Sequence, residues 1–190
     1  MNEFEKKFSD SRYIFGHEEE RSFKIYLRKL IKSNNLKILD IGCGTGLNSI
    51  NFMNKNDVTG IDISEEAIKK YKLINKKCHV ADVIEGIPFE NETFDLVFCS
   101  EVIEHNVDTS KFLNEVNRIL KKDGKLLLST PNSSFWVYRI LSLFGKTLTE
   151  IQHDGHVRFF SIKLIENFLI NSGFKVQKTH SRIIYLIIPY

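Results

Sequence analysis

The chain has 190 residues, of which 42% are hydrophobic and 27% are charged, and its formal net charge is +3. This length predicts one domain, and this composition excludes a disordered or collagen-like chain. The charge falls short of the dense basic patch of a dedicated nucleic-acid binder. Three cysteines, Cys43, Cys78 and Cys99, lack metal-type spacing and indicate reduced thiols. We find neither a secretory signal nor an apolar run near the roughly 20 residues that span a bilayer, so we expect a cytoplasmic protein.

Apolar runs alternate with amphipathic segments along the chain, a pattern typical of an α/β layered fold. We predict strands over residues 37–41, 58–63, 78–81, 94–100 and 125–130, with two final strands over 174–180 and 183–188. We predict helices over residues 4–33, 47–54, 64–74, 110–120, 135–144 and 161–171. Ser64 is expected to cap the third of these helices, and Gly173 to end the last one.

A glycine-rich turn follows the first predicted strand and precedes a predicted helix, with glycines at positions 42, 44 and 46. Glycines at such a turn bring the backbone close to a ligand at the helix N-terminus. Asp40 lies two residues before the first glycine, and Asp62 lies about 20 residues after it, at the tip of the second strand. An acidic side chain there can accept both hydroxyls of a ribose. The G-x-G-x-G spacing disfavours NAD, whose sites carry G-x-G-x-x-G.

Five segments together resemble the class I S-adenosylmethionine-dependent methyltransferases, of the ubiquinone-biosynthesis and type 11 kind, from about residue 35 to residue 174. The segments, in chain order, are ILDIGCGTG, VTGIDIS, HVADV, FDLVFCSEVIEH and RILKKDGKLLLSTPN. The resemblance implies a doubly wound, Rossmann-like and mostly parallel sheet of about seven strands, in which the final strand is antiparallel. It also implies S-adenosylmethionine as the cofactor and S-adenosylhomocysteine as the product.

The same resemblance assigns cofactor-binding roles to ten residues. The amino-acid end of the cofactor would be held by Asp40, Gly42, Cys43, Gly44 and Gly46. The ribose would be held by Asp62 with Ile63, and the adenine would be flanked by Asp82 and Val83. Ser100 would line the floor of the site near the sulfonium.

Two groups of candidate catalytic residues lie beyond the strand ends, where open α/β sheets bind ligands. They are Glu101, Glu104 and His105 in SEVIEHN, and His153, Asp154 and His156 in QHDGHVRFF.

Three interpretations of these residues stay open. His105 or His156 is a general base, because an imidazole titrates near neutral pH, and His105 is our first choice. Alternatively, Glu101, Glu104, His105 and His156 bind a divalent metal such as Mg²⁺, which the resemblance of EVIEH to ubiquinone-biosynthesis O-methyltransferases and small-RNA 3′-terminal 2′-O-methyltransferases implies. Finally, Glu104 and His105 only cap the next helix, and His156 bonds to backbone in a packed loop.

We predict a single domain over residues 1–190, with a helical lid over 1–33, a cofactor-binding core over 34–131 and an acceptor side over 132–190. On the acceptor side, Trp136, Tyr138 and Phe144 with Arg139 form either an aromatic wall or a surface for a lipid-like or membrane-associated acceptor.

The predicted function is methyl transfer from S-adenosylmethionine to a small-molecule, glycan or lipid-precursor acceptor, at oxygen. Three alternatives stay open: 2′-O-methylation of an RNA 3′ end with a divalent metal, a non-catalytic S-adenosylmethionine-binding module, and an NAD-dependent oxidoreductase. The mild charge gives little support to a nucleic-acid partner.

Overall fold

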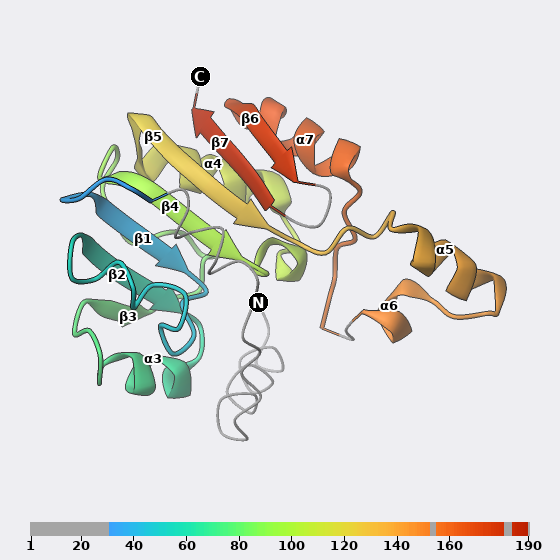
Figure 1. Cartoon of the computed structure of the whole chain (residues 1–190), viewed down its shortest axis with the longest axis horizontal. Coiled ribbons are helices and arrows are strands. Elements are labelled where there is room, and N and C mark those ends of the chain that lie inside the picture. The colour runs from blue at the N-terminus through green and yellow to red at the C-terminus, as the bar shows by residue number, and fades with distance from the viewer. Residues whose placement is uncertain (1–30, 153–154, 181–183, 190) are drawn as a thin grey trace.

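The fold is a seven-stranded sheet with helices packed on it, seen in a computed structural model that describes residues 31–152, 155–180 and 184–189 (Figure 1). The strands are β1 (Lys37–Ile41), β2 (Asp57–Asp62), β3 (Cys78–Val80), β4 (Phe94–Ser100), β5 (Leu120–Ser129), β6 (Phe174–His180) and β7 (Ile184–Pro189). The helices are α3 (Glu65–Tyr71), α4 (Thr109–Ile119), α5 (Trp136–Leu143), α6 (Leu148–Ile151) and α7 (Ile162–Asn171), with a 3-10 turn η1 (Ile103–His105).

The strand order is β3-β2-β1-β4-β5-β7-β6. Strands β1 to β5 pair in parallel, whereas β7 pairs antiparallel with both β5 and β6. The predicted doubly wound sheet with an antiparallel final strand is therefore confirmed. Because neighbouring parallel strands end at one edge, the residues that follow β1, β2, β4 and β5 meet there.

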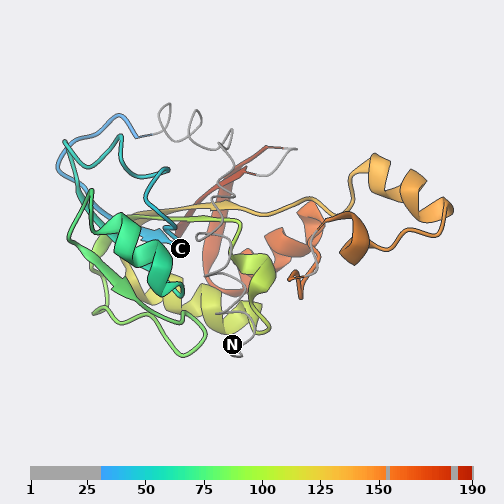
Figure 2. The ribbon, with the colours of Figure 1, turned by 90° about the horizontal axis from the view of Figure 1, so that it is seen from below.

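The central strand β4 is buried on both faces, because its side chains alternate between two clusters of apolar residues. The larger cluster joins the sheet to α4 and α7 and includes Leu39, Val97, Cys99, Phe112, Leu113, Val116, Ile165 and Leu169. The smaller one lies on the opposite face and comprises Ile38, Phe52, Val58, Leu96, Phe98 and Leu127. Helices α4 and α7 pack against one face of the sheet through the larger cluster, whereas α3 packs against the other face, where its Tyr71 lies against Gly60 of β2 (Figure 2). This packing fixes the end of β4, from which the candidate catalytic residues follow.

Side-chain caps begin α3, α4 and α7, and the cap predicted at Ser64 is confirmed. The Ser64 side chain accepts a hydrogen bond from the Ala67 N–H at the start of α3, and Ser161 accepts one from the Leu164 N–H at the start of α7. Asp108 caps α4 in the same way through the Lys111 N–H.

Two predicted elements differ in the structure, which also adds α6 and η1. The helix predicted over residues 47–54 is replaced by consecutive turns, with N–H groups of Ser49, Phe52 and Lys55 each bonded to the carbonyl three residues earlier. Three asparagines in this segment favour turns over helix. Strand β5 begins at Leu120 and not at residue 125, because a bulge in its pairing with β4 accommodates residues 121–124. The predicted lid falls outside the described residues, apart from 31–33, which are not helical.

Helices α5 and α6 form an arm, residues 133–152, that projects away from the sheet (Figures 1 and 2). No residue of α5 is buried, and Trp136, Leu143 and Phe144 are 62%, 83% and 79% exposed. Within the described part of the chain, no helix is long and apolar enough to cross a membrane.

Candidate functional site

The glycine loop, Gly42–Gly46, turns sharply out of β1 because its three glycines adopt the left-handed conformation, with φ of 68°, 54° and 87°. The N–H groups of Gly42 and Cys43 both donate to the carbonyl of Ile61, at 2.9 and 3.0 Å. A β-carbon on Gly42 would lie 2.2 Å from Val102 Cγ2. Backbone bonds and close packing therefore hold this loop against the ends of β2 and β4.

Asp62, at the end of β2, is tied to the same loop. Its Oδ2 accepts a hydrogen bond from the Gly44 N–H at 2.9 Å, and its Oδ1 accepts one from the Ser64 N–H at 2.8 Å. The side chain is only 6% exposed. Each oxygen of a carboxylate can accept more than one hydrogen bond, so these bonds orient Asp62 and leave it able to accept donors from a ligand.

Asp40, near the end of β1, is 1% exposed. Its Oδ2 is buried and has no hydrogen-bond partner among the described residues. Burial raises the pKa of Asp40 well above its ordinary value, and the charge of nearby Asp62 raises it further. A buried carboxylate oxygen in this state is suited to a donor or a positive charge from a ligand.

The remaining predicted cofactor residues lie at neighbouring strand ends. Asp82 follows β3 and bonds through Oδ1 to the Ile84 N–H at 2.9 Å, beside the buried Val83. Ser100 ends β4 and shares a hydroxyl–hydroxyl hydrogen bond of 3.1 Å with Ser129, the last residue of β5. Ile63, directly after Asp62, is half-buried.

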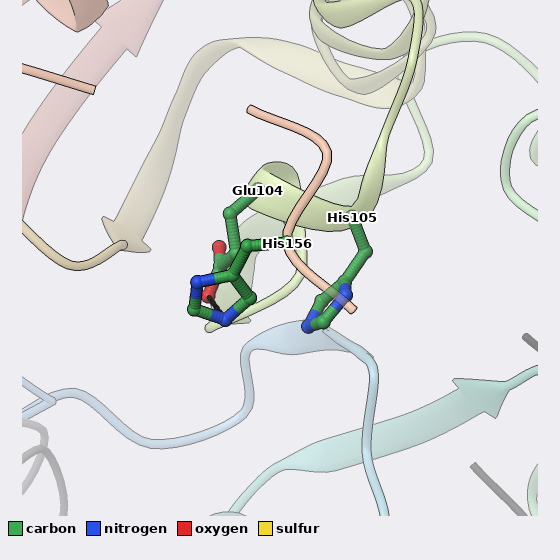
Figure 3. A group of neighbouring side chains, drawn as sticks. All are labelled: Glu104, His105 and His156. Atoms are coloured by element: carbon green, nitrogen blue, oxygen red, sulfur yellow. Dashed lines mark ion pairs between the residues drawn. The ribbon is translucent and has the colours of Figure 1, made fainter. Parts of the chain in front are cut away.

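A second group of side chains, the His–Glu cluster, comprises Glu104, His105 and His156 (Figure 3). One potential ligand atom from each residue lies within 4.8 Å of the others. His156 Nε2 is 3.9 Å from Glu104 Oε1, and the two imidazole rings meet edge to face with centroids 5.0 Å apart. Glu104 is 1% exposed, and its Oε2 accepts a hydrogen bond from the Thr130 hydroxyl at 3.1 Å.

The backbone brings the two halves of the cluster together from positions about 50 residues apart. The N–H groups of Val157 and Arg158 both donate to the Glu104 carbonyl at 3.0 Å. The Arg158 guanidinium donates to the Val107 carbonyl, with the shorter contact at 2.6 Å. These bonds lock the segment that carries His156 against η1.

Sequence reasoning named all three members of this cluster. The metal interpretation also named Glu101, which is not in the group; its carboxylate accepts a hydrogen bond from the Ser129 hydroxyl at 2.9 Å, and its backbone takes a left-handed φ of 58°. His153 and Asp154 lie outside the described residues. The contacts of Thr130, Gln152 and Gly155 with the cluster were missed, since no motif marks these residues.

Comparison with known proteins decides the family. Residues 15–179 match the family model that describes a methyltransferase domain. The chain belongs to the class I S-adenosylmethionine-dependent methyltransferases. The prediction from the sequence motifs is thereby confirmed, and S-adenosylmethionine is the cofactor of this family. The NAD-dependent alternative is set aside.

Two relatives are similar in sequence to most of this chain. An uncharacterized protein of Methanocaldococcus jannaschii is 38% identical over 159 residues, which cover 80% of this chain and 68% of that protein. The human mitochondrial ubiquinone biosynthesis O-methyltransferase is 32% identical over 158 residues, covering 75% of this chain and 42% of the enzyme. The chain therefore spans less than half the length of the human relative.

Among solved structures, a SAM-dependent methyltransferase from Aquifex aeolicus has a TM-score of 0.70 and 17% identity. The likeness covers 94% of this chain and 98% of that one. At this identity it supports the methyltransferase fold and carries no statement about the acceptor.

Proposed function

We propose that this methyltransferase transfers the methyl group to an oxygen atom of a small-molecule, glycan or lipid-precursor acceptor. In this proposal residues 34–131 hold the cofactor and residues 132–190 face the acceptor. The observation that carries the proposal is the His–Glu cluster, which follows β4 at the same edge of the sheet as the glycine loop.

The proposed cofactor site uses the ten residues that the sequence motifs predict. The glycine loop would receive the amino-acid end of the cofactor, with its ammonium group near the buried Oδ2 of Asp40. Asp62 would accept the ribose hydroxyls while its two backbone bonds hold it in place. Asp82 and Val83 would flank the adenine. The donor set fits the cofactor, because it pairs buried acceptors with the hydroxyl and ammonium donors of the ligand.

The His–Glu cluster can act on an acceptor hydroxyl in two ways. A hydroxyl must lose its proton when it is methylated, and an imidazole is suited to accept it near neutral pH. A metal ion bound by the cluster would instead lower the pKa of the hydroxyl. Nitrogen acceptors with a lone pair need neither device, so this cluster favours oxygen.

The donor atoms of the cluster indicate which metal would fit. Two tetrahedral ligands of one ion at about 2.0–2.2 Å are about 3.3–3.6 Å apart. The distance of 3.9 Å between His156 Nε2 and Glu104 Oε1 therefore lies a few tenths of an ångström above that of a bound pair. Two imidazoles with one carboxylate suit Zn²⁺, Fe²⁺ or Mn²⁺, whereas Mg²⁺ prefers oxygen ligands. We therefore propose a transition-metal ion ahead of the Mg²⁺ that the sequence suggested.

Labelled methyl transfer tests the proposal. The chain would be incubated with S-adenosylmethionine carrying a ¹⁴C-methyl group and, separately, with a catechol, a monosaccharide, an aliphatic amine and a short RNA duplex, after chelation and after addition of Zn²⁺ or Mn²⁺. We expect label on a hydroxyl oxygen. His156→Ala should lower the rate at least about 100-fold with cofactor affinity unchanged, and His79→Ala, on the exposed edge strand, should not.

Other outcomes of this experiment separate the alternatives. Transfer only to nitrogen contradicts the oxygen assignment. Label on the 3′ end of the RNA supports the RNA alternative. Cofactor binding without transfer to any of these acceptors supports the non-catalytic module.

The arm supports a more specific proposal, that the acceptor side contacts a lipid-like or membrane-associated acceptor. Its exposed apolar residues would cost about 25 cal/mol for each Å² of apolar surface kept in water. Flotation with anionic phospholipid vesicles tests this. Leu143→Ser should lower the bound fraction, whereas Leu73→Ser, on a residue 85% exposed beside α3, should leave it unchanged. Equal binding by both variants contradicts the proposal.

A further inference from the structure

Both histidines of the His–Glu cluster direct the same ring nitrogen at oxygen atoms of one short segment. His105 Nδ1 lies 2.9 Å from the carbonyl oxygen of Gly155. His156 Nδ1 lies 3.2 Å from the side-chain oxygen Oε1 of Gln152. Both oxygens can only accept hydrogen bonds, so in each neutral ring the proton must be on Nδ1.

This placement of the proton decides what the rings offer to the cluster. With Nδ1 protonated, the lone pair of each neutral imidazole is on Nε2. In His156, Nε2 is the nitrogen that lies 3.9 Å from Glu104 Oε1. A base or a metal ligand acts through such a lone pair, and the partner of the other nitrogen fixes the tautomer.

Only one of the two acceptor oxygens can be removed by substitution. The Gly155 oxygen belongs to the backbone, whereas the Gln152 oxygen belongs to a side chain at the end of α6. The N–H of Gln152 donates to the Leu148 carbonyl at 2.9 Å, and a capping box between Thr147 and Glu150 fixes the start of α6. Gln152 is therefore the point at which the arm contacts the cluster.

The structure places Oε1 of the Gln152 amide, and not Nε2, beside Nδ1 of His156. The Gln152 Nε2 is buried and has no hydrogen-bond partner among the residues that the structure describes. A buried amide nitrogen without a partner is unfavourable. The flipped amide would direct Nε2 at the ring, donate to Nδ1 and select the opposite tautomer, so the two orientations have different and measurable consequences.

We propose that Gln152 is a positioning residue that selects the Nδ1-protonated tautomer of His156 and links the arm to the His–Glu cluster. The tautomer is a property of the chain alone. Its use in methyl transfer rests on the function proposed above.

Long-range ¹H–¹⁵N NMR spectra of the ¹⁵N-labelled full chain read the tautomers directly, at about pH 8.5, where ordinary imidazoles are neutral. Assignment uses His105→Gln and His156→Gln. We expect both histidines of the wild type to be protonated on Nδ1. Gln152→Met, which has similar size but no acceptor oxygen, should give His156 a mixture of tautomers and leave His105 unchanged.

Two further variants separate positioning from a general effect on folding. Gln152→Glu keeps an acceptor oxygen and should restore the wild-type tautomer of His156. Gln177→Met makes the same exchange at the only other glutamine of the chain, an exposed residue of β6, and should change neither histidine. The unchanged His105 signal reports that the cluster is folded in every variant.

Titration with metal ions tests whether Gln152 also affects metal binding by the His–Glu cluster. If the cluster binds Zn²⁺ or Mn²⁺, Gln152→Met should weaken the affinity by about 10-fold or more. A changed tautomer in a chain that binds neither ion supports the role of Gln152 and contradicts only the metal interpretation. A wild-type His156 protonated on Nε2, or a Gln152→Met variant with the wild-type tautomer, overturns the positioning role.

Discussion

The glycine loop and the His–Glu cluster lie at the same edge of one sheet, but they are built in opposite ways. The loop and Asp62 come from one stretch of about 20 residues, and backbone N–H groups make most of the bonds between them. The cluster joins side chains from segments about 50 residues apart, and its bonds include the side chains of Thr130 and Gln152.

This difference matches two different functions, the binding of a cofactor that the whole family shares and the reaction with one particular acceptor. A site made of backbone bonds around a compact motif keeps its geometry while most neighbouring side chains change, which suits a cofactor shared by a whole family. A site made of distant side chains changes when any of its loops changes. We therefore expect substitutions at the glycine loop to affect cofactor binding and folding, and substitutions at the cluster to affect methyl transfer.

The largest expected effect comes from Asp62→Ala. The substitution removes the acceptor of two backbone hydrogen bonds and the proposed acceptor of the ribose hydroxyls. Hydrogen bonds to a charged group contribute about 1.5–3 kcal/mol each, so S-adenosylmethionine affinity should fall at least about 100-fold in calorimetric titration.

Asp57→Ala is the matched control, because it changes the other end of the same strand. Asp57 makes an exposed ion pair with Lys77, which should contribute little. Unchanged affinity in Asp62→Ala, or an equal loss in both variants, would remove the ribose assignment.

The same contrast explains what could be predicted from the sequence. Strand ends, glycine turns and helix caps depend on local patterns, so β1, β2 and the cap at Ser64 could be predicted, whereas the cofactor roles of the ten candidates stay a prediction. The segment over residues 47–54 was predicted wrongly, because its apolar spacing is helical while its asparagines favour turns. The bond between the Glu101 carboxylate and Ser129 could not be predicted, because it joins residues 28 positions apart and Glu101 takes a left-handed backbone conformation.

A smaller effect is expected from Gly42→Ala, which tests how far the loop depends on its glycines. The new β-carbon would lie 2.2 Å from Val102 Cγ2, and the residue would hold a left-handed φ of 68°. The φ cost is about 1–2 kcal/mol and overpacking adds about 1–3 kcal/mol, so urea unfolding should show a loss of about 2–5 kcal/mol.

Gly145→Ala isolates the backbone part of that loss. Gly145 has a φ of 79°, and nothing lies within 4 Å of the position that a β-carbon would take there, so only about 1–2 kcal/mol should be lost. Val102→Ala should partly rescue Gly42→Ala. Equal losses at the two glycines, without rescue, would show that close packing does not constrain the loop.

The smallest expected effect is a pH-dependent one at Asp40. Burial raises its pKa in the folded state, so the folded protein binds the proton more tightly than the unfolded chain. The resulting stability is present below the ordinary carboxyl pKa of about 3.9 and is lost as the pH rises through the folded-state pKa. Asp40→Asn should therefore gain stability relative to the wild type as the pH rises, reaching about 1–2 kcal/mol in urea unfolding at pH 8.

Asp95, at the other end of the sheet, should show the opposite dependence of folding stability on pH. Burial raises the pKa of Asp95, but the hydrogen bond from Lys121 and the bond from the Lys37 N–H outweigh it, so the pKa is lowered. Stability from Asp95 is then present above the ordinary carboxyl pKa and is lost as the pH falls through the lowered value. Asp95→Asn should cost up to about 1 kcal/mol at pH 8, where Asp40→Asn gains stability. A carboxylate that serves only the stability of the fold should behave like Asp95. If Asp40→Asn instead raises the free energy of unfolding and weakens S-adenosylmethionine binding, Asp40 serves the ligand at the expense of the fold. A loss of stability at both positions would show instead that Asp40 is a structural residue.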